Sequence, residues 1–227
     1  MKRHALVLGL LSSSACSGAS PAVDAESVAV PPPGRTVSTS SAVVVSPDAP
    51  ASLPLFDCVA PACVLSDVSI DLPTPQGLIR LRNGSRQPPI DSVPGIYWEA
   101  RDKAKALDLA TTPGETHTHG WAAAGVTNRH RTIVGVLDNV VESPGGELLV
   151  VVSQDVGESW ELRATIEKPY YMAEVKKLEL ESPNRWSIIV ALEDCAGCGV
   201  KIGNYMAKTE DAGKTFTSFY FVGPHGG

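Results

Sequence analysis

The sequence predicts an all-β fold built from repeated four-stranded antiparallel units. An eight-residue pattern occurs twice, at residues 153–160 and 209–216, each time between two apolar runs. From about residue 64 onwards, short β-like runs alternate with Gly, Pro and Asn turns. The composition agrees, because 18 Pro, 20 Gly and only 19% charged residues in 227 are typical of a turn-rich all-β chain.

Residues 1–15 have the pattern of an export signal. Lys2 and Arg3 precede an apolar run at 5–11, and small residues follow it. This run is far shorter than the roughly 20 residues that span a bilayer. We therefore expect a cleaved signal and not a transmembrane helix.

Cys16 directly follows Ser13-Ser14-Ala15, which resembles the lipobox of bacterial lipoproteins. The pattern departs from that family at Ser13, where Leu is usual. The resemblance implies that Cys16 is lipidated and becomes the mature N-terminus, and Ser17 implies sorting to the outer membrane. Ordinary cleavage nearby is the alternative.

Residues 16–54 are rich in Ser, Ala, Val and Pro and carry few charges. Such a stretch cannot bury a core, so we expect an extended, mobile tether before a domain at 55–227. The net charge of the whole chain is -6, and Lys and Arg form no cluster. A nucleic-acid partner is therefore not expected.

Four further cysteines are present: Cys58, Cys63, Cys195 and Cys198. An even number in an exported chain predicts disulfides. Three connectivities are possible, and we expect Cys58–Cys63 and Cys195–Cys198 because each pair is close in sequence. A redox motif at Cys195 and Cys198, or a zinc site of all four, is the alternative. We expect no metal and no other cofactor.

The domain divides into three predicted repeats, at about residues 64–110, 115–166 and 173–222. Each is expected to form four strands, with the eight-residue pattern in the turn from the third strand to the fourth. In the first repeat, residues 99–107 form a degenerate copy, which keeps an acid at Asp102 but lacks the glycine. The alternative there is a short helix at 98–109, which the local composition favours.

The eight-residue pattern has a structural role at every position. Its hydroxyl, Asp, Gly and aromatic positions are Ser153, Asp155, Gly157 and Trp160 in the first copy, and Thr209, Asp211, Gly213 and Phe216 in the second. We expect the Gly to adopt a positive φ, the Asp and hydroxyl to accept hydrogen bonds from backbone N–H groups, and the aromatic ring to pack inward. Catalytic or calcium-binding Asp residues are the alternative, but a calcium loop would need more acids.

These residues resemble the Asp box, or BNR repeat, of sialidase-like β-propellers. The resemblance covers residues 115–222 well and 64–114 weakly. It implies a partial or degenerate β-propeller of two to three four-stranded antiparallel blades, with the boxes on the face away from the ligand site. Propellers have four to eight blades, so a shorter array could self-associate through its open blade edges. The sialidase Arg-Ile-Pro motif is absent, so a working sialidase is not implied.

The resemblance also predicts that the ligand loops lie at the opposite ends of the strands, at 83–95, 111–120, 139–146, 167–172 and 193–202. Their candidate binding residues are His117, His119, Tyr170, Tyr171, Glu193 and Asp194. The two histidines could hold a metal, or be solvated. The two tyrosines could stack on a sugar or peptide, or one could pack inward and the other outward. The two acids, with Glu142, could form a glycosidase carboxylate pair, or be solvated.

The sequence thus predicts an exported, lipid-anchored binding or structural module that is not an enzyme. Its ligand would be a glycan or a protein. The alternative is a glycan-active hydrolase with an atypical site.

Overall fold

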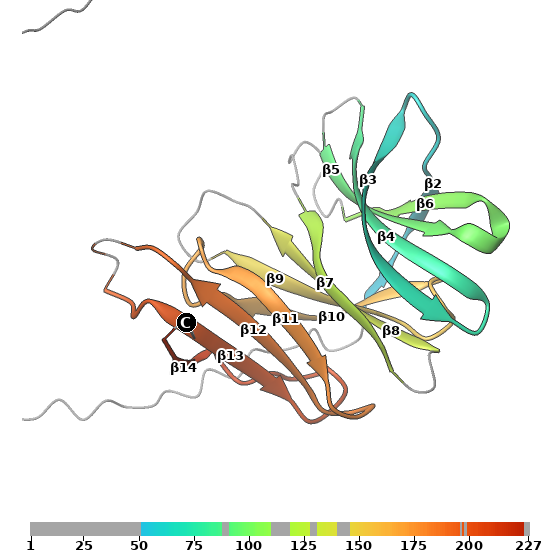
Figure 1. Ribbon diagram of the computed structural model, residues 1–227. Coiled ribbons are helices and arrows are strands. Elements are labelled where there is room, and N and C mark those ends of the chain that lie inside the picture. Colours follow the sequence, from blue (N-terminus) through green and yellow to red (C-terminus); the bar gives the residue numbers. More distant parts are fainter. Residues whose placement is uncertain are drawn as a thin grey trace, which may run out of the picture. The chain divides into compact units, whose positions relative to one another are not determined.

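The computed structural model describes residues 51–87, 91–109, 119–127, 131–139, 146–195, 197 and 199–224. The chain divides into two units, 1–39 and 40–227, and every described residue belongs to the second. These residues form three antiparallel sheets and one 3-10 helix (Figure 1), so the predicted all-β fold is confirmed. No helix in the described part of the chain has the length and apolar character needed to cross a membrane.

The first sheet has the strand order β2-β6-β5-β4-β3. Its strands are β2 (Leu55–Asp57), β3 (Cys63–Thr74), β4 (Gly77–Arg86), β5 (Asp91–Trp98) and β6 (Lys103–Leu107). Four consecutive strands form a meander, and β2 pairs with its last strand, β6. The 3-10 helix Glu99–Arg101 connects β5 to β6. The alternative of a helix at 98–109 is therefore wrong beyond this one turn.

The second and third sheets repeat the meander. The second has the order β1-β10-β9-β8-β7 and the third the order β11-β12-β13-β14. The strands of the second are β1 (Ala51–Leu53), β7 (His119–Thr127), β8 (Thr132–Asn139), β9 (Glu147–Ser153) and β10 (Trp160–Glu167). Those of the third are β11 (Glu174–Leu180), β12 (Trp186–Leu192), β13 (Gly203–Thr209) and β14 (Tyr220–Gly223). The meanders coincide closely with the three predicted repeats.

Strand β1 corrects the end of the expected tether, which was placed at residue 54. Ala51 pairs with Leu162 and Leu53 with Trp160, so the segment is part of the second sheet. Leu53 also packs against the core between the first and second sheets. This apolar contact holds residues 51–53 in the sheet, although the composition of the segment by itself predicts an extended, unpaired chain.

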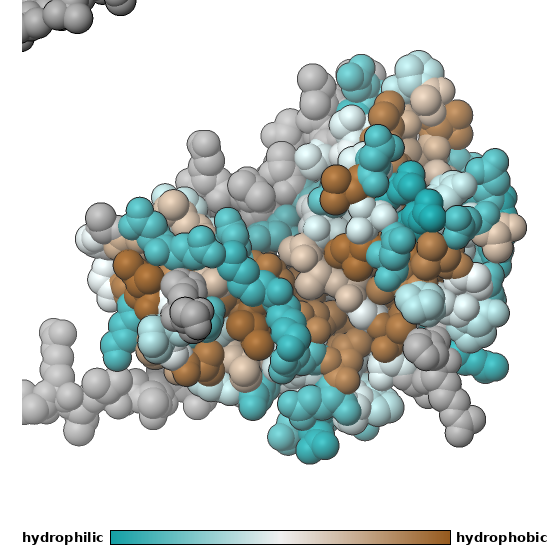
Figure 2. Space-filling view, in the orientation of Figure 1, coloured by the Kyte–Doolittle hydropathy of each residue, from teal (hydrophilic) through white to brown (hydrophobic). Residues whose placement is uncertain are grey.

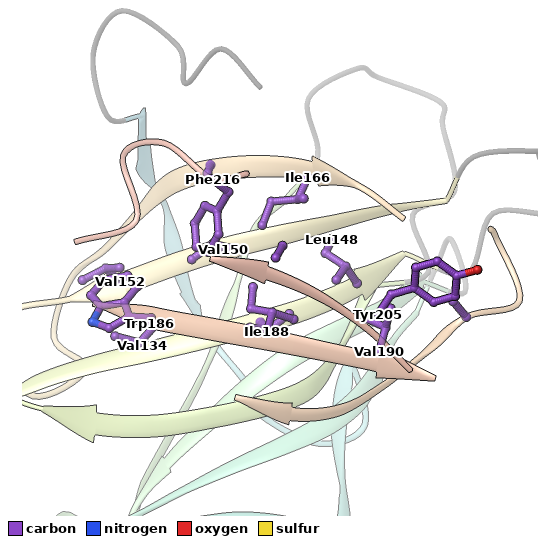
Figure 3. Packing of buried hydrophobic residues seen from close by; sticks show 14 of the residues in the cluster. Val134, Leu148, Val150, Val152, Ile166, Trp186, Ile188, Val190, Tyr205 and Phe216 are labelled. Carbon is purple, nitrogen blue, oxygen red and sulfur yellow. The ribbon is translucent and has the colours of Figure 1, made fainter. Parts of the chain in front are cut away.

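The second sheet is covered on both faces. Ile133 and Leu137 of β8 pack into a core with Leu81 and Ile96 of the first sheet. Val134 and Val136, on the other face of β8, pack into a core with the third sheet. Figure 3 shows this second core, in which Val134, Leu148, Val150, Val152 and Ile166 meet Trp186, Ile188, Val190, Tyr205 and Phe216. Burial on both faces explains why β8 and β9 are apolar along their length instead of alternating.

The other face of the first sheet is covered by its own chain. Cys58 and Cys63 form the predicted disulfide, with their Cα atoms 4.9 Å apart, and both are buried beside Val93. Leu65 lies so close over Gly95 that a Cβ there would be 2.2 Å from its Cδ2 atom. This local core closes a sheet face that would otherwise be open, and the disulfide is consistent with an exported protein.

Candidate functional site

The connections between strands fall at two ends of the sheets. We call the end with residues 153–160 and 209–216 the box end. We call the opposite end, with residues 168–173 and 193–202, the loop end. Each box lies between the third and fourth strands of its meander. The loop end carries the connections within which the candidate binding residues were predicted.

The box at 153–160 is held by its own side chains. The Ser153 hydroxyl donates to Asp155 Oδ1 at 2.9 Å and accepts from the Gly157 N–H at 2.7 Å. Ser159 donates twice to Asp155, from its N–H to Oδ1 at 2.8 Å and from its hydroxyl to Oδ2 at 2.6 Å. Gly157 has a φ of 86°, a conformation that favours glycine. The turn therefore uses the Asp carboxylate as its internal acceptor.

The second box has the same geometry. The Thr209 hydroxyl donates to Asp211 Oδ1 at 2.8 Å and accepts from the Gly213 N–H at 3.0 Å. The N–H and hydroxyl of Thr215 donate to the two Asp211 oxygens at 2.9 and 2.6 Å. Partial burial by itself would raise the pKa of Asp211, but the hydrogen bonds from Thr215 and Thr209 outweigh it and lower the pKa below its usual value.

The pKa of Asp155 is lowered for the same reasons, because the bonds from Ser159 and Ser153 outweigh the effect of burial. A carboxylate that is held ionised by its own turn is a poor general acid.

The corresponding turn of the first sheet lacks this geometry. There Asp102 has a φ of 47° and accepts a hydrogen bond from the Tyr97 hydroxyl at 2.8 Å. The degenerate copy thus occupies a turn at the box end, but its Asp has a different partner.

At the loop end, sequence reasoning missed a buried ion pair. Lys168 Nζ lies 2.9 Å from Asp138 Oδ1, and the two side chains are only 4% and 20% exposed. The Lys168 N–H also donates to the Gly146 carbonyl at 2.8 Å. The pair joins the end of β8 to the connection between the second and third sheets. A lone Lys beside Pro169 gives no local signal of this partner.

The predicted tyrosines lie in the same connection. The Tyr170 ring packs against the core of the second and third sheets, and its centroid is 4.7 Å from that of Tyr171. Partial burial and the neighbouring Tyr171 raise the pKa of Tyr170. Tyr171 and Met172 are 38% and 51% exposed. One tyrosine therefore packs inward and supports an exposed neighbour, which is the second of the two predicted arrangements.

The remaining candidates are His119, the adjacent pair Glu193 and Asp194, and residues outside the described part of the chain. His119 is buried at the start of β7, and His117 and Glu142 lie outside the described residues. Glu193 pairs with Lys176 at 2.7 Å, and Asp194 is exposed beside it. Among the described residues, no three His, Cys, Asp or Glu side chains are grouped to hold a metal ion. Cys195 is disulfide-bonded, and Cys198 lies outside the described residues.

A charged band borders the loop end of the third sheet. Lys176 Nζ contacts Glu174 Oε2 at 2.9 Å as well as Glu193 Oε1 at 2.7 Å. Figure 2 shows hydrophilic side chains along β11, and apolar ones over the neighbouring β7 and β8. The exposed tyrosine and methionine therefore lie in a connection that leads directly into a strand with a charged surface.

Among the described residues, two hollows open at the box end. One, of about 340 Å³, is lined by residues that include Gln154, Ser159 and Trp160. The other, of about 180 Å³, lies between the second and third sheets and is lined by residues that include Arg163 and Trp186. Their walls combine residues of the box turns with Ser52 of β1 and with the turns that join β7 to β8 and β11 to β12.

No protein-family model matches the chain, and no curated protein sequence does. Among solved structures, an alpha-L-arabinanase of Penicillium chrysogenum complexed with arabinobiose is similar, with a TM-score of 0.43 and 13% identity. The match covers 82% of this chain and 56% of that one, so the chain spans a little over half of that protein's length. A similarity at this level assigns no activity to the chain.

Proposed function

We propose that the protein is an exported, lipid-anchored binding module without catalytic activity, which holds a glycan or a protein at the loop end of its second and third sheets. The observation that carries the proposal is the exposed Tyr171, which is supported from beneath by Tyr170. The Asp residues of the box end are engaged in their own turns. The loop end is where an aromatic ring is both exposed and held in place.

The contact with Tyr170 favours binding at Tyr171, because a side chain that is already held in place loses less conformational entropy when a ligand binds. Tyr170 packs against the core, and its carbonyl accepts from the Ala173 N–H at 2.9 Å, which closes the turn. The Lys168–Asp138 pair fixes the start of the same connection. A ring presented in this way offers a large apolar face at a low ordering cost.

The charged band supplies the polar part of the site. Lys176 and Glu174 lie on β11, the strand that follows the tyrosines directly, and Glu193, just after the neighbouring β12, adds a second carboxylate beside the Lys176 ammonium. A glycan has apolar C–H faces and hydroxyl edges, so it matches an aromatic ring beside polar groups. Of the two ligand classes, this chemistry favours a glycan.

Export and anchoring rest on separate observations. The Cys58–Cys63 disulfide is consistent with an oxidising compartment. The resemblance of residues 13–16 to a lipobox supports lipidation of Cys16 and an outer-membrane location. The two boxes support membership in the Asp-box family, because both have the same pattern of turn hydrogen bonds.

A glycan array probed with the full chain tests the binding proposal. We expect retention of at least one glycan, and a loss of about tenfold in affinity in Tyr171→Ala, which corresponds to one aromatic contact. Tyr220→Ala is the matched control, because Tyr220 is similarly exposed but lies on β14. Retention of no glycan, or equal losses in both variants, would contradict the proposal. Capture of a protein ligand that depends on Tyr171 would instead select the other ligand class.

A glycan-active hydrolase is the second candidate. It is favoured by Glu174 and Glu193, whose carboxylates share the Lys176 ammonium and therefore lie close together, as a glycosidase requires. Against it, their side chains are 71% and 64% exposed, whereas a general acid needs burial to raise its pKa. Retained glycans should be recovered intact after incubation. Release of reducing ends that Glu193→Gln abolishes would establish the hydrolase instead.

A further inference from the structure

The indole N–H groups of the four tryptophans are not all used in the same way. Three of them donate to a main-chain carbonyl: Trp98 to Val156 at 3.1 Å, Trp121 to Gly95 at 2.9 Å and Trp160 to Gly157 at 3.0 Å. Trp186 is only 2% exposed, and its Nε1 atom has no hydrogen-bond acceptor among the described residues. A buried donor without an acceptor is rare in folded proteins, so this nitrogen indicates a position where a further acceptor can bind.

Trp186 is also one wall of the hollow of about 180 Å³ that lies between the second and third sheets at the box end. Figure 3 shows the indole nitrogen at the end of the core farthest from Val190 and Tyr205. The turns that join β7 to β8 and β11 to β12 border the hollow at this same end. Pockets for whole small molecules usually measure about 300–1,000 Å³. The hollow therefore has room for one chemical group of a larger ligand.

The other walls of this hollow combine polar and apolar groups. The polar side chains are those of Thr127, Thr132, Gln154, Asn184 and Arg163, and the apolar ones are those of Val152, Pro183 and Ala212. Hydroxyl and carboxamide groups can each donate and accept hydrogen bonds. A ligand group that fits such walls has an acceptor for the Trp186 N–H, a donor of its own and a small apolar part.

The charges around the hollow favour a neutral ligand group. The side chain of Arg163 is 10% exposed, and its guanidinium contacts the carboxylate of Glu161. Burial lowers the pKa of Arg163, and the neighbouring Asp211 carboxylate acts in the opposite direction. An anion would gain little from a guanidinium that these two carboxylates already neutralise. A cation would face the guanidinium directly, because Arg163 lines the hollow and neither carboxylate does.

We propose that this hollow binds a neutral carboxamide, of the kind at the end of an asparagine or glutamine side chain, and that the Trp186 N–H donates to its carbonyl oxygen. The NH2 group of the ligand donates to the hydroxyl or carboxamide oxygens of the walls, and its apolar carbon lies against Val152 and Pro183. The partner that carries such a group is a protein, which the module holds at its box end. This site is separate from the loop end, so it does not depend on the proposed glycan binding.

The indole resonances of the isotopically labelled full chain test this assignment. Acetamide is the probe, and acetate, which has the same shape and a negative charge, is its matched control at the same pH. We expect acetamide to shift the Trp186 indole resonance until it saturates, and acetate to leave it unchanged. The indole resonances of Trp98, Trp121 and Trp160 should stay in place with both probes, because their N–H groups already have carbonyl partners.

Two variants locate the bound probe. Trp186→Phe keeps an aromatic ring but removes the donor, so the acetamide affinity read from the backbone amide of Gln154 should fall about tenfold, the equivalent of one neutral hydrogen bond. Thr132→Ile keeps Trp186 and places a larger side chain in the wall of the hollow. It should abolish the saturable shift of the Trp186 indole, even if Trp186→Phe does not fold. No saturable shift in the wild-type protein, an equal shift with acetate, or an unchanged response in Thr132→Ile would overturn the proposal.

Discussion

At the box end, Asp155 and Asp211 each accept three hydrogen bonds from residues within four positions of them. At the loop end, Lys168 meets Asp138 from thirty residues away. Lys176 likewise meets Glu193 across two strands and their connection. The box end is therefore built from local turn chemistry, which any suitable eight-residue segment can form by itself. The loop end depends on the formation of the second and third sheets, each of which brings residues that are distant in sequence together.

The largest expected loss of stability comes from a substitution at the loop end. Asp138→Ala leaves the Lys168 ammonium buried without its carboxylate, so we expect the free energy of unfolding to fall by about 3 kcal/mol. Urea unfolding measures this. The double variant Asp138→Leu/Lys168→Met should recover most of the loss, because it removes both charges. Lys176→Ala, at a solvent-exposed pair, is the control and should reduce the free energy of unfolding far less. Equal losses of stability in Asp138→Ala and Lys176→Ala would contradict this, because the buried pair would then stabilise the fold no more than the exposed one.

A somewhat smaller difference in the free energy of unfolding should distinguish Gly→Ala variants of the two boxes. Gly213 has a φ of 81°, and a Cβ there would lie 2.4 Å from Trp186 Cζ3. Gly157 has a φ of 86°, but its nearest contact, with Trp98 Cζ2, is 3.3 Å. Both Ala variants carry the cost of the left-handed conformation, about 1 kcal/mol. Only Gly213→Ala adds overpacking, for a total of about 3 kcal/mol. Equal losses of stability in urea unfolding would contradict this difference.

The smallest expected effect is on how the stability of the fold depends on pH, through Asp155 at the box end. The folded pKa of Asp155 lies below its ordinary value of 3.8, so the folded state binds its proton less readily than the unfolded state. The resulting stabilisation is present above pH 3.8 and is lost as the pH falls through the folded pKa. Asp155→Asn should therefore unfold with a shallower dependence on acid than the wild-type protein. Unfolding curves measured between pH 5 and pH 2 test this, and an unchanged slope would contradict it.

The same contrast explains which features could be predicted from the sequence. The positions and hydrogen bonds of the two boxes follow from short patterns, because every partner of Asp155 and Asp211 lies in the same turn. The Cys58–Cys63 disulfide was predictable for the same reason.

Features that depend on distant partners could not be predicted in this way. Nothing near Lys168 indicates that Asp138 neutralises it, since the two residues meet only after the second sheet has formed. Strand β1 lies in a stretch whose Ser, Ala and Pro content predicts an unpaired chain, and only the exposed edge of β10 makes it a strand. The degenerate copy at Asp102 shows a further limit: the turn lies where it was predicted, but Asp102 accepts its hydrogen bond from the Tyr97 hydroxyl, which no eight-residue pattern indicates.

The most direct test of the account is to locate the bound ligand on the protein. Amide resonances of the isotopically labelled full chain can be followed while a glycan retained on the array is added. We expect the amide resonances of residues 170–174 and 193 to shift, and those of residues 154–159 and 210–215 to stay unchanged. Shifts confined to the two boxes would contradict it, because the ligand would then lie at the end whose polar groups the turns already use.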